Sequence, residues 1–294
     1  MATRIRTVVI PAAGRGTRLL PATKTTPKEL LNVYDRPALQ FAIDEAIDLD
    51  VDRIVIVLHP DKGTIRDYLS PAGGYASLLR ASGKADLAQC LQDLDVPSRI
   101  DVMFAEQAEP LGLGHAVLCA AGLTLPGPFA VLLPDDLIFG QPCLSEMAAH
   151  YIKGHMIAAM EVSSADTGSY GIFALAGLSI GRSVPVSGMV EKPSAGRAPS
   201  RLAAVGRYIL DPRIFDSLPH VAKGSGGEIQ LTDAIERDAA HVPLTAYRFS
   251  GTRYDCGTHD GLMAASLARQ AGVKHQQLVP TQGLHGAHSS AALV

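Results

Sequence analysis

Short apolar runs separated by amphipathic stretches recur along the chain. Residues 7–10 and 53–58 (RIVIVL) are rich in β-branched side chains and apolar on both faces, which is typical of strands buried inside a sheet. Between them, residues 37–49 carry apolar side chains at helical spacing. This alternation predicts a mostly parallel sheet in the first half, with helices covering both of its faces.

The remaining pattern predicts a longer series of elements. Further strands are expected at 100–105, 129–133, 156–162, 170–175, 202–210 and 244–249. Further helices are expected at 61–69, 115–121, 143–152, 228–239 and 259–271. Residues 74–94 are polar and helical, as in a surface insertion, and the polar residues after Gly272 have no period. We therefore expect one domain over residues 1–272, divided into halves near residue 140, and a flexible tail at 273–294.

Composition restricts the class of protein. The 294 residues are 47% hydrophobic and 19% charged, so the chain can bury a large core. A formal net charge of -3 argues against a nucleic-acid-binding protein, which usually has a strongly basic face. There is no apolar stretch of the length that a signal peptide or a membrane helix needs. The four cysteines lack metal-site or redox spacing, which indicates a reducing compartment and predicts a cytoplasmic protein.

The loop after the first strand is the most informative segment. Gly14-Arg15-Gly16-Thr17-Arg18 begins it, and Lys28 follows ten residues later. Glycines at such a turn let backbone N–H groups approach a phosphate, and the two cations add charge there. The spacing is neither a Walker loop nor the dinucleotide fingerprint. An ordinary surface loop is the alternative, although loops of this length inside compact domains are usually functional.

This loop and seven later segments resemble one family. The segments are GRGTRLLPATKTTPKEL (14–30), LGLGHAVLCA (111–120), LLPDD (132–136), SYGI (169–172), VEKP (190–193), VGRYIL (205–210), GEIQLTDAI (227–235) and YDCGT (254–258). Their order and spread resemble the bacterial UTP–glucose-1-phosphate uridylyltransferases, within the sugar-1-phosphate nucleotidyltransferases. The resemblance implies a Rossmann-like, GT-A-like α/β fold: a three-layer sandwich with a mixed, mostly parallel central sheet. It also identifies the two halves as a nucleotide half (about 1–140) and a sugar half (about 141–272). Residues 75–96 carry no motif.

The resemblance also implies roles for individual residues. Nucleotide-binding positions would be Ala12, Ala13, Gly14, Gly16, Thr17, Glu29, Gln107 and Gly112. Sugar-binding positions would be Gly171, Glu191 and Val205. The catalytic residues would be Arg18, Lys28, Asp135 and Lys192, with Asp135 and Asp255 as metal ligands.

The chemistry of three of these sites can be weighed from residue types. The Gln107 amide offers a donor and an acceptor that can match a pyrimidine edge, although a solvated loop glutamine has the same spacing. Asp135 and Asp136 follow a strand, where carboxylates suit Mg²⁺, but paired aspartates are also common in turns. The resemblance favours Asp135 as the ligand, with Asp136 facing away or supporting the site. Asp255 is either a second ligand or a helix cap.

Glu191 and Lys192 pose a geometric problem. Neighbouring strand residues point to opposite faces, so both can reach one ligand only where the strand twists or ends, and Pro193 is consistent with an end. The resemblance gives the glutamate to sugar hydroxyls and the lysine to phosphate. An exposed ion pair is the alternative. His59 and His115 receive no chemical role, and His115 is expected to pack or support its loop.

The implied reaction joins UTP and glucose 1-phosphate into UDP-glucose and pyrophosphate, with Mg²⁺ as cofactor, in carbohydrate metabolism. A thymidylyltransferase is the nearest alternative, but that group typically has Lys-Gln where this chain has Lys28-Glu29. A non-catalytic sugar-nucleotide sensor is a second alternative, and it would be expected to lose some of the phosphate- and metal-binding residues. By analogy with the family we also expect a homo-oligomer, a dimer or tetramer, without nucleic-acid or membrane partners.

Overall fold

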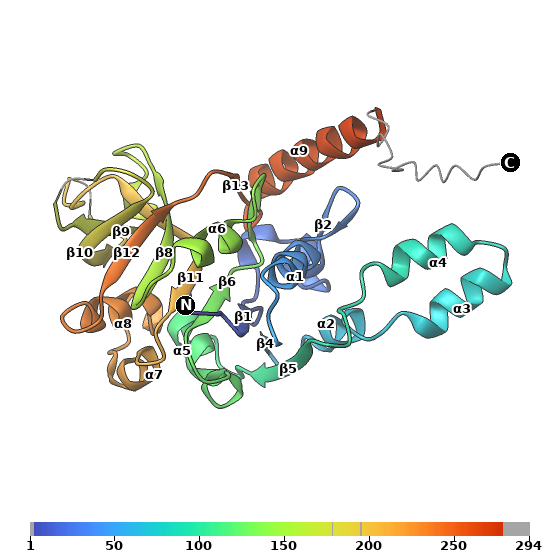
Figure 1. Cartoon of the computed structure of the whole chain (residues 1–294), viewed down its shortest axis with the longest axis horizontal. Coiled ribbons are helices and arrows are strands. Elements are labelled where there is room, and N and C mark those ends of the chain that lie inside the picture. Colours follow the sequence, from blue (N-terminus) through green and yellow to red (C-terminus); the bar gives the residue numbers. More distant parts are fainter. Residues whose placement is uncertain (1–2, 178, 195, 279–294) are drawn as a thin grey trace, which may run out of the picture.

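The structure is a computed structural model that describes residues 3–278, except 178 and 195. Its main strands are β1 (Thr7–Pro11), β4 (Arg53–Leu58), β5 (Asp101–Glu106), β6 (Phe129–Leu132), β8 (His155–Glu161), β9 (Gly171–Leu175), β10 (Ser183–Glu191), β11 (Leu202–Leu210) and β12 (Leu244–Arg248). In the described residues they form one nine-stranded sheet, in the order β5-β4-β1-β6-β11-β8-β12-β10-β9 (Figure 1).

The direction of the strands changes along this sheet. β5, β4, β1 and β6 are parallel to one another. β11 is antiparallel to β6, β8 and β9, and β10 is antiparallel to β9 and β12, while β8 and β12 are parallel. The predicted mixed, mostly parallel α/β sheet is confirmed: seven of the nine strands run in one direction, and β10 and β11 run against them. In the second half, consecutive strands such as β9 and β10 pair directly, so no crossover helix imposes parallel pairing there.

Helices cover both faces of the sheet and give three layers. One face carries α1 (Ala38–Asp48) and α6 (Cys143–His150), and the other carries α5 (Gly112–Cys119), α7 (Ile214–Ser217) and α8 (Leu231–Asp238). Strand alternation divides the core between them, since Val8 and Ile10 pack on the α1 side and Val9 packs on the α5 side. This arrangement explains why the first strands are apolar on both faces.

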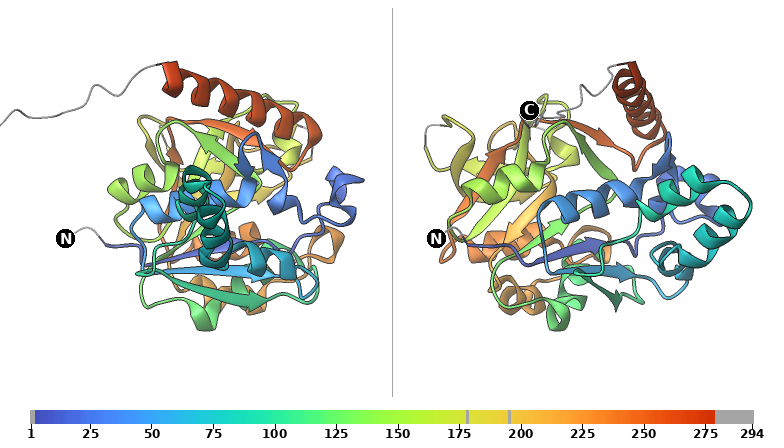
Figure 2. Two further views of the ribbon diagram at one scale, coloured as in Figure 1. Left: turned by 90° about the vertical axis from the view of Figure 1, so that its right-hand side faces the viewer. Right: turned by 45° about the vertical axis from the view of Figure 1, so that its right-hand side comes forward.

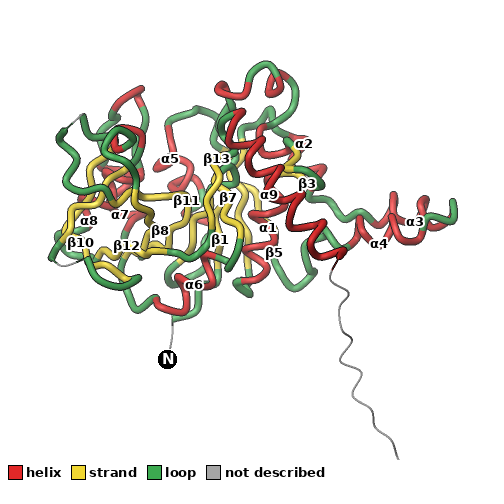
Figure 3. The backbone as a smooth tube through the Cα atoms, turned by 90° about the horizontal axis from the view of Figure 1, so that it is seen from above, coloured by secondary structure: helices red, strands yellow, loops and turns green. Residues whose placement is uncertain are grey.

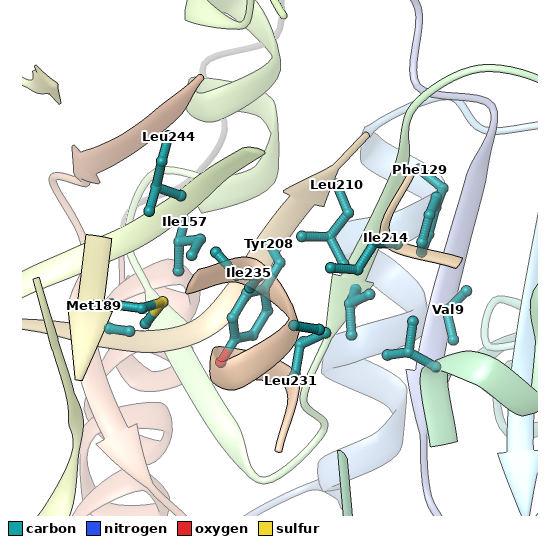
Figure 4. Packing of buried hydrophobic residues seen from close by; sticks show 14 of the residues in the cluster. Val9, Phe129, Ile157, Met189, Tyr208, Leu210, Ile214, Leu231, Ile235 and Leu244 are labelled. Atoms are coloured by element: carbon teal, nitrogen blue, oxygen red, sulfur yellow. The ribbon is translucent and has the colours of Figure 1, made fainter. Parts of the chain in front are cut away.

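The second of these core layers connects the two halves of the chain. Figure 4 shows Val9 and Phe129 from the parallel strands packed in the same cluster as Tyr208, Leu231 and Ile235 from the second half. All five side chains are buried. The two halves therefore share one continuous core at the level of the sheet.

Two helical segments lie outside these layers. After α2 (Gly63–Tyr68), α3 (Gly73–Ala81) and α4 (Ala85–Gln92) form a hairpin that projects from the body (Figures 1 and 3), as the predicted polar insertion suggests. The last helix, α9 (His259–Leu278), lies on the outside of the body (Figure 2). It continues beyond its predicted end at residue 271, and residues 279–294 of the expected tail lie outside the described residues.

Several elements were not predicted. They include β10 and two small antiparallel pairs, β2 (Asn32–Val33) with β3 (Arg36–Pro37) and β7 (Asp136–Phe139) with β13 (Thr252–Asp255). Short 3₁₀ turns occupy η1 (Thr17–Leu19), η2 (Ala22–Lys24), η3 (Lys28–Leu30), η4 (Ala121–Leu123), η5 (Thr167–Ser169), η6 (Leu218–His220) and η7 (Ser225–Gly227). No helix in the described part of the chain is long and apolar enough to cross a membrane.

Candidate active site

The β7–β13 pair brings two distant aspartates together. Asp135 lies in the turn before β7, and Asp255 ends β13 opposite Asp136. The next backbone N–H, that of Cys256, donates to the Asp135 carbonyl oxygen at 2.7 Å. A Cβ atom on Gly257 would lie 3.1 Å from Asp135 Oδ2 and 3.0 Å from Asp255 Oδ1. The two predicted metal ligands therefore converge on one point, which a glycine leaves open.

Two cations neutralise these carboxylates. The Lys28 ammonium forms an ion pair with Asp135, and Arg18 Nη1 lies 3.7 Å from Asp255 Oδ2. Burial alone would raise the pKa of Asp135, but Lys28 holds that pKa below its ordinary value of 3.8. Burial alone would lower the pKa of Lys28, but Asp135 raises it above 10.5. Both groups therefore stay charged at neutral pH.

This donor set can be tested for its fit to a metal ion. Within the described residues no group of three or more His, Cys, Asp and Glu side chains could hold a metal alone. A pair of converging carboxylates is nevertheless the protein contribution that Mg²⁺ usually has, with substrate phosphates and water completing its shell. Asp135 and Asp255 therefore fit a divalent ion that binds together with a phosphorylated substrate.

A cavity of ≈ 790 Å³ opens beside the aspartates. It gathers seven of the predicted site residues, from both halves of the chain: Arg18, Asp135, Gly171, Glu191, Lys192, Val205 and Asp255. Lys28 is not among the lining residues but bonds directly to Asp135. The cavity therefore unites the predicted metal ligands with the predicted sugar-binding residues.

Glu191 and Lys192 can face the same cavity because the strand ends between them. β10 stops at Glu191, and Lys192 adopts a left-handed backbone conformation with φ 43°. Its N–H donates to the Tyr170 carbonyl oxygen at 3.0 Å, which fixes the turn. As a result both side chains line the same cavity, with Lys192 Nζ 3.4 Å from Glu191 Oε1. Gly171 lies against Glu191, because a Cβ there would be 3.2 Å from the carboxylate.

Asp136 supports the site from within the fold, which is one of the two positions expected for it. Its carboxylate accepts a hydrogen bond from the Gly206 N–H at 2.7 Å and forms an ion pair with Arg253. Burial raises the pKa of Asp136, an effect that Arg253 opposes. Arg253 Nη1 also donates to the Tyr170 hydroxyl at 3.0 Å and so connects β13 to the residue that precedes β9.

A buried arginine holds the turn that carries Asp135. Arg207, in the middle of β11, is 1% exposed and pairs with Glu45 of α1. Its Nη1 donates to the carbonyl oxygens of Leu133, Asp136 and Gly206 at 3.2, 2.7 and 3.0 Å. Since a buried charge is stable only when it is fully paired, these contacts fix the backbone on both sides of Asp135.

The glycine-rich loop is anchored by a lysine that follows β4. Lys62 Nζ donates to the carbonyl oxygens of Ala12 and Gly14, both at 2.7 Å, and to Glu29 Oε2 at 2.8 Å. Burial lowers the pKa of Lys62 and raises that of Glu29. Glu29 is 1% exposed and does not line the cavity, and Ala12 and Ala13 are also buried. Glu29 acts on the loop by way of Lys62.

The exposed part of the loop turns at Gly16. This residue has φ 66°, and a Cβ there would lie 3.1 Å from Lys28 Cβ. Glycine is therefore required both by the left-handed conformation and by the approach of Lys28. The turn leads into η1, where Thr17 and Arg18 are exposed and Arg18 lines the cavity.

Gln107 and Gly112 lie at the neighbouring strand end. The Gln107 N–H, just after β5, donates to the Leu58 carbonyl oxygen at 2.8 Å. Neither predicted base contact lines the cavity, but Leu113 does. Gly112 has φ 91°, and a Cβ there would be 3.0 Å from the Ile229 carbonyl oxygen. Residues 228–230 are extended to make this contact, so α8 begins at residue 231 and not at 228 as predicted.

Three positioning residues were not predicted from the sequence: Lys62, Arg207 and Arg253. Lys62 follows a parallel strand, at the edge of the sheet where ligands bind, so its position in the sequence could have identified it. Arg207 is a lone charge inside an apolar strand, and such residues are rarely buried without a specific partner. Arg253 gave a weaker signal, because its partner Asp136 is distant in the sequence.

The chain was compared with known proteins. Residues 7–271 match the family model described as nucleotidyl transferase. The chain is 40% identical over 282 residues to the UTP–glucose-1-phosphate uridylyltransferase of Bacillus subtilis (strain 168), covering 94% of this chain and 96% of that protein. The solved structure of a UTP-bound UGPase from Acinetobacter baumannii matches with a TM-score of 0.83 at 36% identity, covering 95% and 100% of the two chains. A UDP-glucose pyrophosphorylase complexed with UDP-glucose matches with a TM-score of 0.79 at 34% identity, covering 91% and 99%.

Proposed function

The chain belongs to the nucleotidyl transferase family, and we propose that it makes UDP-glucose and pyrophosphate from UTP and glucose 1-phosphate. One observation carries the proposal beyond the likeness to named relatives. Asp135, Asp255 and Lys192 meet at one cavity, with Arg18 and Lys28 beside them. This is the charge pattern needed to align two phosphorylated substrates.

The reaction is a phosphoryl transfer without a general base. A phosphate oxygen of glucose 1-phosphate is already anionic at neutral pH, and it attacks the α-phosphorus of UTP while the bond to pyrophosphate breaks. The protein must therefore hold the two anions in line and offset their repulsion. Arg18 and Lys28 neutralise the triphosphate and the departing pyrophosphate. Lys192 orients the sugar phosphate, and Glu191 accepts hydrogen bonds from the hexose hydroxyls.

Nucleotidyl transferases generally use a divalent metal, and we propose Mg²⁺ for this chain. Asp135 and Asp255 would hold the ion, whose charge would stabilise the phosphate oxygens in the transition state. The open point at Gly257 supports this arrangement, since no side chain there fills the space between the two carboxylates, and Lys192 lines the same cavity.

The nucleotide would lie over the glycine-rich loop. Ala12, Ala13, Gly14, Gly16 and Thr17 would border the nucleotide, with Glu29 supporting the loop through Lys62. Gln107 and Gly112 would bind the uracil, while the backbones of Gly171 and Val205 would border the sugar. The order of these elements along the sheet edge supports a nucleotide half at about 1–140 and a sugar half at about 141–272.

The proposal is tested by measuring pyrophosphate release from Mg²⁺, glucose 1-phosphate and each nucleoside triphosphate in turn. Fast release with UTP, slower release with dTTP and none without metal is the expected result. Faster release with dTTP than with UTP would favour a thymidylyltransferase. If folded protein releases nothing with any triphosphate, the enzymatic proposal is wrong and a sugar-nucleotide sensor becomes the better account.

The cellular setting and assembly are also proposals. All four cysteines are free thiols, which supports a reducing compartment such as the cytoplasm. The projecting α3–α4 hairpin exposes Tyr75, Leu78 and Leu87, a concentration of apolar side chains that supports self-association into a dimer or tetramer. Light scattering should give a multiple of the 30.9 kDa chain mass, and a monomer at micromolar concentration would refute the assembly.

A further inference from the structure

The side-chain amide of Gln107 has only one orientation that its surroundings accept. Its Nε2 lies 3.0 Å from the Gly112 carbonyl oxygen and 3.1 Å from His115 Nδ1. A carbonyl oxygen can only accept a hydrogen bond, so the amide atom facing Gly112 must be the NH₂ group. The opposite orientation would set two carbonyl oxygens against each other.

This orientation in turn fixes the state of His115. Both amide protons need acceptors, and the second points to His115 Nδ1, which accepts only when it carries no proton. The imidazole proton then resides on Nε2, which lies 3.8 Å from Cys119 Sγ. Cys119 is four residues along α5 from His115 and therefore on the same helix face. Burial raises the pKa of Cys119, so its sulfur remains a neutral thiol and can act as a weak acceptor.

These contacts leave one hydrogen-bond acceptor, on Gln107, and one donor, on Gly112, for a ligand. Gln107 Oε1 makes no hydrogen bond to any residue that the structure describes, and it is not among the buried polar atoms that lack partners. The Gly112 N–H likewise makes none within the described residues. An acceptor beside a donor complements a base that presents an N–H beside a carbonyl oxygen. Uracil has this pattern at N3 and its flanking oxygens, whereas N3 of cytosine is itself an acceptor.

We propose that His115 is a specificity-determining positioning residue: together with the Gly112 carbonyl oxygen, it holds the Gln107 amide so that its own carbonyl oxygen faces the base and only a pyrimidine with a protonated N3 is bound well. The proposal rests on the proposed function, because it assumes that the base binds at Gln107. Thymine has the same N3 pattern as uracil, so His115 discriminates against CTP and not against dTTP.

Two substitutions at His115 separate a role in hydrogen bonding from a role in packing. His115→Asn keeps an acceptor near the position of Nδ1, whereas His115→Leu has nearly the same size and no acceptor. In the leucine variant one amide proton of Gln107 loses its partner, so only the Gly112 carbonyl oxygen still opposes a turn of the NH₂ group toward the base. The measured quantities are kcat/KM for UTP and for CTP with saturating glucose 1-phosphate, and KM for glucose 1-phosphate with saturating UTP.

The expected result is a fall of about tenfold or more in the UTP-to-CTP ratio for His115→Leu, which corresponds to one unsatisfied polar group. It should arise mainly from a higher KM for UTP, with KM for glucose 1-phosphate unchanged. His115→Asn should keep a ratio close to that of the wild type. An unchanged ratio in His115→Leu, or an equal fall in both variants, would overturn the proposal. Absence of turnover in the wild-type enzyme would instead refute the proposed function.

A second measurement uses the wild-type chain and does not depend on the activity of the variants. Proton–nitrogen correlation of the histidine side chains can be assigned to His115 by its disappearance in His115→Asn. An unprotonated Nδ1 and a protonated Nε2 at neutral pH are expected. A proton on Nδ1 would place two donors against each other and would contradict the proposed orientation of the amide.

Discussion

The two halves of the cavity reach the same edge of the sheet by different means. In the nucleotide half, β1, β4, β5 and β6 are parallel, so their carboxyl ends place the glycine-rich loop, Lys62, Gln107 and Asp135 side by side. In the proposed sugar half most pairings are antiparallel, because β10 and β11 run against the other strands, so the carboxyl ends do not all lie at one edge. There the site residues depend on local irregularities, such as the left-handed Lys192 and the register shift in β11 after Ala204.

The two parts of the site are held in position by different kinds of interaction. The nucleotide loop is positioned mainly by backbone hydrogen bonds to one cation, Lys62. The turn that carries Asp135 and the sugar side are positioned by buried ion pairs, Arg207 with Glu45 and Arg253 with Asp136. Removing Lys62 should weaken nucleotide binding. Removing either buried ion pair should weaken sugar binding or destabilise the whole fold. The two halves meet at Gly257.

The largest effect is expected at this meeting point. Gly257→Ala would place a methyl group 2.6 Å from Arg18 Nη2, 3.0 Å from Asp255 Oδ1 and 3.1 Å from Asp135 Oδ2. Since misplacement by about 1 Å costs roughly 10²-fold, turnover should fall at least about 10²-fold with both substrates saturating. Gly272→Ala is the matched control, because a Cβ there meets nothing within 4 Å. Equal activity in the two variants would show that the convergence at Gly257 is not part of the catalytic site.

Lys192 tests the sugar half alone. Its side chain is 54% exposed, so Lys192→Ala should change stability by less than about 0.5 kcal/mol. Removing the cation that orients the sugar phosphate should lower turnover by about 10²-fold and leave UTP binding nearly unchanged. Steady-state kinetics and thermal unfolding measure the two quantities, and Lys153→Ala, at another exposed lysine, is the control. Wild-type turnover in Lys192→Ala would remove this residue from the mechanism.

Lys62 tests the nucleotide half alone. Lys62→Met removes the anchor of the Ala12 and Gly14 carbonyl oxygens, so KM for UTP should rise about tenfold while KM for glucose 1-phosphate stays unchanged. The single change also leaves Glu29 buried without its partner and should cost about 3 kcal/mol of stability. Adding Glu29→Gln should recover most of the stability but not UTP binding. If the double variant recovers both, the lysine serves only to neutralise Glu29.

The pair between Lys28 and Asp135 predicts a smaller, pH-dependent effect on stability. The pKa of Asp135 is lowered, so its contribution is present above about pH 4 and is lost as pH falls through its folded-state value. The pKa of Lys28 is raised, so its contribution is present below 10.5 and is lost at higher pH. Lys28→Met should therefore cost about 1–3 kcal/mol between pH 5 and 9, and progressively less in acid. A cost that does not change between pH 7 and pH 2.5 in urea unfolding would contradict the assigned pair.

The contrast between the two halves also explains which strands could be predicted from the sequence. Residues 53–58 were predicted as a strand with the bounds that β4 has, because β-branched residues fill both of its faces. β10, with Pro185, Ser187 and Gly188 in its middle, was missed, since its local composition is that of a turn. β7 and β13 are too short to show a period and exist because Arg253 and Asp136 pair across them.

The site residues likewise fall into those that a local pattern predicts and those that depend on distant contacts. Asp135 and the glycine-rich loop are next to strand ends, so a local pattern and the family resemblance both pointed to them. Arg207 and Lys62 act through contacts with residues far away in the sequence, which no local pattern encodes. The orientation of Gln107 by His115 is a third such case, because a spacing of eight residues does not reveal a shared hydrogen bond.

The proposed nucleotide half and sugar half act on a single reaction centre at Asp135 and Asp255. A crystal structure of the full chain with UDP-glucose and Mg²⁺ tests it most directly. The account predicts uracil N3 against Gln107 Oε1, the metal between the two aspartates and the phosphates, and the glucose hydroxyls on Glu191. UDP-glucose bound with its phosphates away from Asp135 and Lys192, or a metal held without either aspartate, would contradict the account.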